Sequence, residues 1–469
     1  MRLRIDRLSC MVLAGIFPWK RGAAAPLHAA HTGGRSVISF ERWRDGFVMT
    51  VEGRRILRHS SSSPAIFLGT TKVKASSKKV QGIGDGQVWK NPGACEIINE
   101  GPDLTVLEFG SFCTIRISYV DRVLRLRFFP SSAINGGIRI KLGANPKEKL
   151  FGAGPSTLYD LKGKKLLTRP SDDKTKLRGN LSVMSNMGTW MNVDGGEILS
   201  WNFGASLTDL SCSVLPAEIA LGFGNSTAMG IEMLTRHLAG KLGKTVRERL
   251  PQSIQSGFFL EEAFAEPLPA DAGRLKSAED LVTMILSLSL AGKGNVYMPL
   301  DGFRMKDAAN SRSDAAHALE IAAFGPLFTM SEPENVQDEV LGRRMKAALT
   351  IHEMLKPYRD FCSENWVEKG IPILIHPAVY YPEEEGLWEL RDQYMFGPDL
   401  LIAPTPEGGT RTRRLCLPRD EWIHLWTSRH YRNGATVVDA PEGKPAVFYR
   451  KESRFVELFN AIRQKATRF

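Results

Sequence analysis

The spacing of turn residues constrains the fold of this chain more than any other feature of its sequence. Across residues 36–250, glycine, proline, asparagine and aspartate separate short segments rich in β-branched and aromatic residues, which is typical of strands. The expected strands are Val37–Phe40, Phe47–Val51, Ala65–Leu68, Leu104–Phe109, Thr114–Tyr119 and Val123–Phe129. No long segment here shows the 3.6-residue period of a helix, so the sequence predicts a large β-sandwich.

The pattern changes to helical in the middle of the chain. Ser277–Ala291 is apolar enough for a buried helix, and Ser313–Phe324 is rich in good helix formers. Glu334–Lys369 is the longest helical stretch, and we expect Pro357 to kink or split it.

Short strands return after residue 370. The expected elements are Ile371–Ile375, Leu400–Ala403, Arg414–Leu417, Glu421–Trp426, Ala435–Val438 and Ala446–Tyr449, followed by a helix over Arg454–Arg463. The predicted order is therefore a large β region, a small α-rich region and a small β region. At about 150 residues per domain, 469 residues correspond to about three domains.

Composition and charge exclude several classes of protein. Hydrophobic residues make up 43% and charged residues 24%, and no apolar run approaches the length of about 20 residues that a membrane helix needs. The net charge of +11 comes largely from the first 60 residues, which carry 11 Lys or Arg against 4 acids. This clustering favours a solvated basic tail over residues 1–35 and argues against a nucleic-acid partner.

Targeting and cofactor signals are sparse. An apolar segment at Cys10–Phe17 precedes small residues at Ala23–Ala25, but Lys20 and Arg21 interrupt the outline of a signal peptide. We therefore expect a cytoplasmic protein, with export through an N-terminal signal as the alternative. The six cysteines form no C-x-x-C and the histidines no H-E-x-x-H, so no metal, nucleotide or flavin cofactor is expected.

An ordered series of motifs in the C-terminal third resembles a known family. The series contains Lys369–Leu374, His376-Pro377, Asp392–Pro404, Leu417-Pro418, Trp422, Trp426-Thr427 and Pro445–Arg450. It resembles glycoside hydrolase family 31, whose barrel ends in G-x-P-v-x-R-P and then D-x-Q-y-m-x-G-x-d-L-L-v-A-P. Leu417–Ser453 is most similar to the sulfoquinovosidase branch.

Earlier segments agree with this resemblance. Leu286–Gly294 resembles the family helix before the seventh barrel strand, and Ala323–Leu327 resembles the family's a-F-s-P-l. Lys356-Pro357-Tyr358 matches the last two positions of L-x-P-Y, and Leu150–Gly154 resembles y-G-x-G-E. The resemblance covers residues 36–255 and 277–460.

The resemblance implies an architecture and a chemistry. Family members combine a β-sandwich, a (β/α)8 barrel and small C-terminal β domains, and they hydrolyse α-glycosides with retention through an Asp nucleophile and a second carboxylic acid. For this chain it implies a multidomain β and α/β fold: a galactose-mutarotase-like N-terminal β-sandwich over 36–251, a truncated (β/α) barrel remnant over 252–370, and a C-terminal β-sandwich over 371–469.

The chain is too short in its middle for the family's barrel. A (β/α)8 barrel takes about 250 residues. Only about 120 residues lie between the end of the sandwich near Pro251 and the β region that starts near Ile371. We therefore expect most barrel strands to be absent and no closed barrel to form.

The catalytic positions of the family have no clear counterparts. Gly257–Pro267 is loosely similar to the strand that delivers the nucleophile, but the register that aligns Glu266 places Ala263 at the nucleophile position. Glu262, Glu266 and Asp271 are the candidate catalytic residues that remain. A solvated linker is the alternative role for the two glutamates. The family's acid/base motif G-D-x-x-x-x-W has no match.

The sugar-binding positions of the family are altered as well. Pro299 replaces the Asp of S-D-i-G-G-f, although a shift of register would let Asp301 bind substrate; the alternative is a tight turn at Asp301. Thr329 begins the segment that replaces R-x-H, Pro155 stands at the Glu of y-G-x-G-E, and His376 stands at the Arg of x-R-P. Trp422 and Trp426, four residues apart, are expected on one face of a strand, in the core rather than under a sugar, and Trp190 and Trp201 are expected to pack the sandwich.

Three hypotheses about function follow. The first is a catalytically inactive family relative involved in carbohydrate metabolism, a pseudoenzyme that serves as a sugar-binding or assembly subunit. The second is an active α-glycoside hydrolase, for a sulfosugar among other substrates, that completes its site with a partner chain. The third is the product of an in-frame deletion without a function of its own.

A partner chain is also expected from the helices of the barrel remnant. Most strands that would cover them are missing, yet Leu319, Ile321 and Ala323 and then Met345, Leu349 and Met354 need burial. We expect a homo-oligomer or another partner chain to cover these faces, with repacking inside the chain as the alternative.

Overall fold

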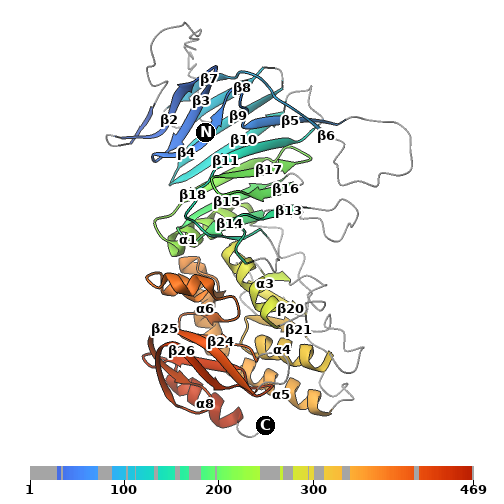
Figure 1. The fold of residues 1–469 in the computed structure, drawn as a ribbon. Helices are drawn as coiled ribbons and strands as arrows, with labels where there is room; N and C mark the ends of the chain where they lie inside the picture. The colour runs from blue at the N-terminus through green and yellow to red at the C-terminus, as the bar shows by residue number, and fades with distance from the viewer. Residues whose placement is uncertain are drawn as a thin grey trace, which may run out of the picture.

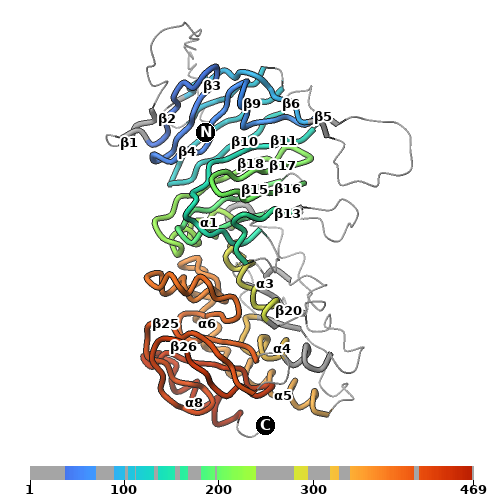
Figure 2. Tube along the Cα trace, viewed as in Figure 1, coloured from blue at the N-terminus to red at the C-terminus, as the bar shows by residue number. Residues whose placement is uncertain are grey.

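The computed structural model shows an elongated molecule with sheets at both ends and helices between them (Figure 1; Figure 2). The structure describes residues 29–32, 35–71, 87–101, 104–110, 112–130, 136–153, 159–167, 181–195, 198–242, 265–267, 278–293, 295–299, 311–329, 339–405 and 411–466. The first described residues therefore lie in a sheet and the last in a helix at the opposite end of the molecule, and the barrel remnant occupies the middle.

Three antiparallel sheets build the N-terminal half. Four strands form the first sheet in the order β1(Ala29–Thr32), β2(Arg35–Trp43), β3(Gly46–Val51) and β4(Arg54–His59). The eight-stranded sheet has the order β12(Leu150–Gly152), β14(Leu181–Ser185), β15(Thr189–Asp194), β18(Glu218–Phe223), β10(Val123–Pro130), β9(Cys113–Val120), β8(Leu104–Phe109) and β7(Glu96–Gly101). The six-stranded sheet has the order β13(Lys165–Leu167), β16(Ile198–Phe203), β17(Leu207–Cys212), β11(Ile138–Gly143), β5(Ile66–Thr71) and β6(Gln87–Lys90).

These sheets confirm the predicted β-sandwich. The strand β11 alternates buried and half-buried residues along its whole length, as a strand with one face in a core does. Its buried residues Ile140 and Leu142 share one hydrophobic cluster with Leu126 of β10 and Trp201 of β16. Trp190 and Trp201 are both buried, as predicted.

The expectation that the region before residue 250 contains no long helix is wrong. Helix α1(Thr227–Leu242) packs on β14, β15 and β18, on the face of the eight-stranded sheet that carries Trp190. Its buried residues Ile231, Leu234 and Leu238 do follow a helical spacing. Gly230 and Gly240 resemble helix breakers in the sequence, but a Cβ on Gly230 would lie 2.4 Å from the carbonyl oxygen of Gly188, so packing requires a glycine there.

The middle of the chain forms a fragment of a (β/α) barrel. The described part of this region holds one parallel sheet of three strands, in the order β19(Ala265–Pro267), β20(Asn295–Pro299) and β21(Leu327–Thr329). The helices are α3(Ala278–Leu290), α4(Ser311–Ala323), α5(Glu339–Met354) and α6(Lys356–Lys369). The split between α5 and α6 directly before Pro357 confirms that prediction, and within the described residues the sheet does not close.

The C-terminal region is a second β unit. Its six-stranded sheet has the order β22(Leu374–Ile375), β23(Tyr394–Phe396), β24(Leu400–Ala403), β27(Ala446–Arg450), β25(Thr412–His424) and β26(His430–Asp439). Two short helices, α7(Pro377–Tyr380) and the 3-10 helix η5(Glu385–Glu389), follow β22, and α8(Val456–Ala466) ends the described chain. The two strands expected over residues 414–426 are one strand, β25, with an irregular register between Leu417 and Glu421.

The two C-terminal tryptophans do not share a strand face. Trp422 of β25 is fully buried and donates a hydrogen bond through Nε1 to the carbonyl oxygen of Pro418 at 2.9 Å. Because β25 ends at His424, Trp426 lies in the following turn, half-buried, with its Nε1 bound to the carbonyl oxygen of Pro445. Its ring lies edge-on to Phe324 at 6.2 Å, so Trp426 joins the C-terminal sheet to the barrel remnant.

The helices of the barrel remnant are covered within the chain. Ile321 and Met345 are 0% and 2% exposed, and they belong to one hydrophobic cluster that extends from α1 to the C-terminal sheet. Leu319 and Ala323 are buried too, while Leu349 and Met354 are half-buried. The uncovered helix faces that we expected therefore do not occur at these residues, and a partner chain stays a prediction without that support.

Two further findings concern the ends and surfaces of the chain. Residues 29–32, inside the segment predicted as a basic tail, form β1 and pair with β2, whereas residues 1–28 lie outside the described part. None of the described helices has the length and apolar character needed to cross a bilayer.

Candidate functional site

In a (β/α) barrel the active site forms at the carboxyl ends of the parallel strands, so this edge of the three-stranded sheet is the first place to examine. The strand β20 ends at Pro299, which is level with Thr329 at the end of β21. The described ends of these two neighbouring strands therefore carry a proline and a threonine, neither of which can act as an acid, a base or a carboxylate nucleophile.

The candidate Glu266 lies one residue before the described end of β19. In the parallel pairing of β19 with β20, Glu266 is level with Val296. Val296 comes three residues before Pro299, and a strand rises about 3.3 Å per residue, so the backbone of Glu266 is set back by about 10 Å from the end of β20. The catalytic role of Glu266 remains a prediction.

The other candidates fall outside the described residues. Glu262 precedes β19, Asp271 follows it, and Asp301 follows β20 by two positions in the sequence, but the structure describes none of the three. The same holds for Ala263 and Pro155. These candidates remain predictions.

His376, at the position of the family's Arg, is a structural residue. The imidazole is fully buried and stacks on the indole of Trp388, with 4.8 Å between ring centroids and an angle of 4°. Nε2 lies 2.9 Å from the carbonyl oxygen of Leu390, and Nδ1 accepts a hydrogen bond from the backbone N–H of Ala378 at 3.1 Å. Both ring nitrogens are satisfied only if Nε2 carries the proton, which describes a neutral imidazole.

His376 also joins the N-terminal sandwich to the C-terminal region. Its ring stacks on Tyr159 at 5.8 Å, and Tyr159 in turn packs on Phe151 of β12. Burial lowers the pKa of His376 to about 4, because the site offers no water to the charged form. The side chain at this position is therefore uncharged, and both of its ring nitrogens are bonded to backbone groups. It cannot serve as a cationic sugar ligand.

The lowered pKa of His376 leads us to predict that the stability of the chain depends on pH. Its pKa in the folded chain lies below the usual 6.5, so the unfolded chain binds the proton more readily. The free energy of unfolding should fall as the pH drops from about 6.5 towards about 4, by about 3 kcal/mol from His376 alone. Urea unfolding across this range should show a shallower fall for His376→Phe, whereas a variant at exposed His430, His430→Phe, should keep the slope of the parent. Equal slopes for parent and His376→Phe would contradict the assignment.

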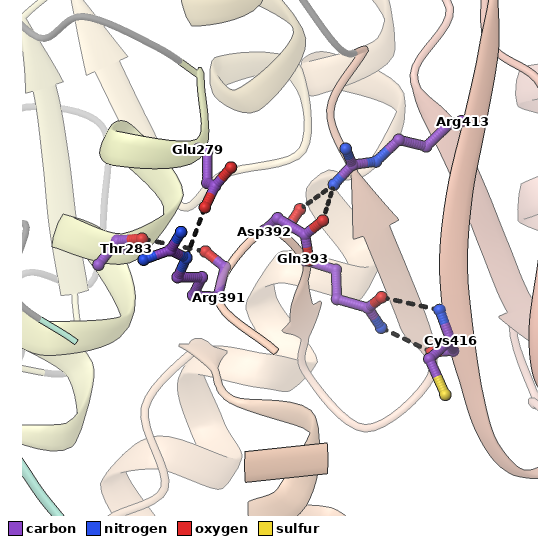
Figure 3. Close-up of polar contacts among 7 residues, drawn as sticks. All are labelled: Glu279, Thr283, Arg391, Asp392, Gln393, Arg413 and Cys416. Carbon is purple, nitrogen blue, oxygen red and sulfur yellow. Dashed lines mark hydrogen bonds and ion pairs between the residues drawn. The ribbon is translucent and has the colours of Figure 1, made fainter. Parts of the chain in front are cut away.

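Arg391 and the motif residues Asp392 and Gln393 connect the barrel remnant to the C-terminal sheet (Figure 3). The side chain of Arg391 pairs with Glu279 of α3 at 2.5 Å, and its carbonyl oxygen accepts a hydrogen bond from Thr283. Asp392 binds Arg413 of β25 at 2.6 Å.

Gln393 completes this connection. Its buried amide bonds both backbone groups of Cys416, with Oε1 accepting from N at 3.0 Å and Nε2 donating to O at 2.7 Å (Figure 3). All three consecutive residues are therefore used in structural contacts, and each of them contacts a segment distant in sequence. These structural contacts account for the family pattern at Asp392 and Gln393 without a catalytic role.

A buried carboxylate that the sequence did not single out lies at the same junction. Glu320 of α4 is 4% exposed and accepts hydrogen bonds from the backbone N–H and the hydroxyl of Thr405 and from the backbone N–H of Gly443. Burial raises the pKa of Glu320, and these hydrogen bonds oppose the effect. Its oxygens are occupied by the chain, so Glu320 stabilises the contact between α4 and the C-terminal region.

No metal site is found in the described part of the chain, where no three His, Cys, Asp or Glu side chains come together as ligands would. Cys95, Cys113, Cys212 and Cys362 are buried free thiols, and Cys416 is a half-buried free thiol.

Comparisons with known proteins identify the C-terminal region. Residues 370–453 match the model of the glycosyl hydrolase family 31 C-terminal domain. A sulfoquinovosidase of Escherichia coli is 29% identical over 192 residues, which are 39% of this chain and 28% of that protein. A sulfoquinovosidase of Agrobacterium fabrum is 33% identical over 153 residues, which are 31% of this chain and 23% of that protein. The chain thus matches about a quarter of the length of these curated relatives.

Solved structures extend the similarity to the whole fold. A family 31 sulfoquinovosidase from E. rectale, solved with an aza-sugar inhibitor, has a TM-score of 0.67 at 16% identity, covering 90% of this chain and 99% of that one. A family 31 α-xylosidase from a soil metagenome has a TM-score of 0.53 at 13% identity, covering 90% of this chain and 97% of that one. At such identities the comparison establishes the fold alone.

Proposed function

Because this chain is a relative of glycoside hydrolase family 31, similar to the sulfoquinovosidases, we propose that it is a catalytically inactive member of that lineage. It keeps the N-terminal sandwich and the C-terminal domain, and it keeps only a fragment of the barrel in the described residues. In this proposal the protein acts in carbohydrate metabolism through binding or assembly, and it does not cleave a glycosidic bond.

The observation that carries the proposal is the register of the three-stranded sheet. Retaining hydrolysis needs two carboxyl groups about 5 Å apart on opposite sides of the anomeric carbon. The described ends of β20 and β21 carry Pro299 and Thr329, and Glu266 is set back from them. No pair of carboxyls in the described part of this sheet meets the requirement.

The environment of His376 supports the same conclusion. An arginine at this position could bind a sugar hydroxyl or an anionic substituent through its fork of N–H groups. His376 instead donates and accepts hydrogen bonds within the backbone of its own segment and stacks between aromatic rings. In this proposal a substrate would therefore find neither the arginine contact nor the acid and the nucleophile of the family.

Hydrolysis assays test the proposal. Chromogenic α-glucoside and sulfoquinovoside should be incubated with the purified, folded chain and, as a positive control, with the E. coli sulfoquinovosidase at equal concentration. We expect no release of the chromophore above background from this chain, because loss of a single essential group typically lowers kcat by several powers of ten.

Turnover at a rate ordinary for glycosidases would contradict the proposal. The variants Glu262→Gln, Glu266→Gln, Asp271→Asn and Asp301→Asn then show which carboxyl is responsible. If no turnover occurs, a sugar-binding isotherm separates a binding subunit from a chain that has no carbohydrate ligand.

A further inference from the structure

A cavity of about 550 Å³ lies between strands of the N-terminal sandwich. It is bounded by the beginning of β4, the end of β11, the beginning of β15 and the end of β18, all in the upper half of Figure 1. Its volume is in the range of pockets that hold small organic ligands, which is about 300–1,000 Å³.

The chain builds this cavity through a close backbone contact. A Cβ on Gly143, the last residue of β11, would lie 2.0 Å from the carbonyl oxygen of Arg55. Only glycine lets β4 approach β11 there, and this approach forms one wall. The lining is mostly apolar, and its hydrophobic side chains include Ile56, Leu142, Leu150, Val183, Met191 and Leu221.

Two arginines stand at the entrance. Arg54 and Arg55 line the cavity and are also exposed, so the cavity opens to solvent beside them. The guanidinium carbon of Arg54 lies 5.6 Å from the ring centroid of Phe223, another lining residue. Within the part of the chain that the structure describes, neither arginine has a carboxylate partner.

Glu148 is the one acidic residue among those that line the cavity, and its hydrogen bonds come from neutral groups. Its Oε2 accepts from the hydroxyl of Thr189 at 2.9 Å, and its Oε1 accepts from the backbone N–H of Asn145 at 3.2 Å. Glu148 is 8% exposed, so its carboxylate is held inside the wall. Two arginines against one acid leave the lining with a net positive charge.

We propose that this cavity binds an amphipathic organic anion, with an apolar body inside the sandwich and a carboxylate or sulfonate head at Arg54 and Arg55. The apolar wall supplies the affinity for the body, at about 25 cal/mol per Å² of surface removed from water. The guanidinium group of Arg54, beside Phe223 of the lining, supplies paired N–H donors that match the oxygens of such a head, and Arg55 adds a second positive charge to the lining. The site is separate from the strand edge that the family uses for hydrolysis, so it does not depend on the proposed loss of catalysis.

Calorimetric titration of the full chain tests this proposal with three ligands of equal chain length. Decanoate and decanesulfonate are the anions, and decanol is the neutral match. We expect one site for each anion and an affinity for decanol at least tenfold lower. The double variant Arg54→Gln/Arg55→Gln should weaken both anions at least tenfold and leave decanol unchanged, because the apolar wall is intact.

Arg58 provides the matched control. It lies on the same strand β4, is exposed, and stacks on Trp43 at 4.5 Å outside the cavity lining, so Arg58→Gln should bind the anions like the parent. Val183→Phe places a larger side chain in the lining of the cavity and should abolish binding of all three ligands. Equal affinity for decanol and the anions, anion binding that survives the double variant, or no anion binding to the parent would each overturn the proposal.

Discussion

Replacing His376 by arginine, the residue of the family motif, is expected to lower the free energy of unfolding by about 3–5 kcal/mol. The imidazole is fully buried, stacked on Trp388, and bonded at both nitrogens, so an arginine would bring an unpaired charge into an apolar site. The loss of stability should lower the midpoint of urea unfolding markedly. Tryptophan fluorescence is a suitable signal because Trp388 stacks on the substituted side chain.

The exposed His430 of β26 provides the control for this substitution. His430→Arg changes the same side chain at a solvated position, and its unfolding midpoint should stay close to that of the parent. If His376→Arg is as stable as His430→Arg, the site has room and solvent for an arginine. The assignment of a structural role to His376 would then be wrong.

Truncating Tyr358 to alanine is expected to destabilise the chain by about 4–5 kcal/mol. The ring is fully buried between α6, β23 and α8, with Phe396 and Phe455 at 5.3 and 5.1 Å. Its hydroxyl donates to the carbonyl oxygen of Phe396 at 2.6 Å and accepts from the N–H of Asp399 at 2.9 Å. Alanine leaves a cavity and two unsatisfied backbone groups.

The variant Tyr358→Phe separates the two contributions. It keeps the ring and removes only the hydroxyl, so it should cost about 1–3 kcal/mol, clearly less than alanine. Parallel urea unfolding of both variants gives the comparison. An alanine variant no less stable than the phenylalanine variant would show that the ring contacts contribute little.

Local patterns predicted much of the fold. The six N-terminal strands named from the sequence occur, as do α3, α4, the split between α5 and α6, and the terminal helix. Helix α1 was missed because Gly230 lowers the helix propensity of its segment. A glycine is needed there because a Cβ would collide with the backbone of Gly188, 42 positions earlier in the sequence. The face of Trp426 was missed because the end of β25 depends on pairing with β26 and β27.

For the candidate site, the sequence mainly predicted which residues of the family motifs are replaced. The motif comparison identified Pro299, Thr329 and His376 as departures, and the structure shows what two of these positions do: Thr329 ends a strand beside Pro299, and His376 joins two domains. The roles of Glu320 and of the cavity beside Arg54 depend on contacts between distant segments. Such contacts have no local period or spacing, so one sequence could not reveal them.

The absence of a catalytic nucleophile is the central claim, and covalent trapping tests it most directly. The carboxylate of a retaining enzyme displaces fluoride from the anomeric carbon of a 5-fluoro-α-glycosyl fluoride, and the resulting glycosyl ester hydrolyses slowly enough to be detected by its mass. After incubation with the folded chain, intact-mass spectrometry should show the unmodified mass of 52.1 kDa, while the E. coli sulfoquinovosidase with its matching sugar gains one glycosyl group. A stoichiometric glycosyl adduct on a carboxylate between residues 252 and 305 would contradict the account.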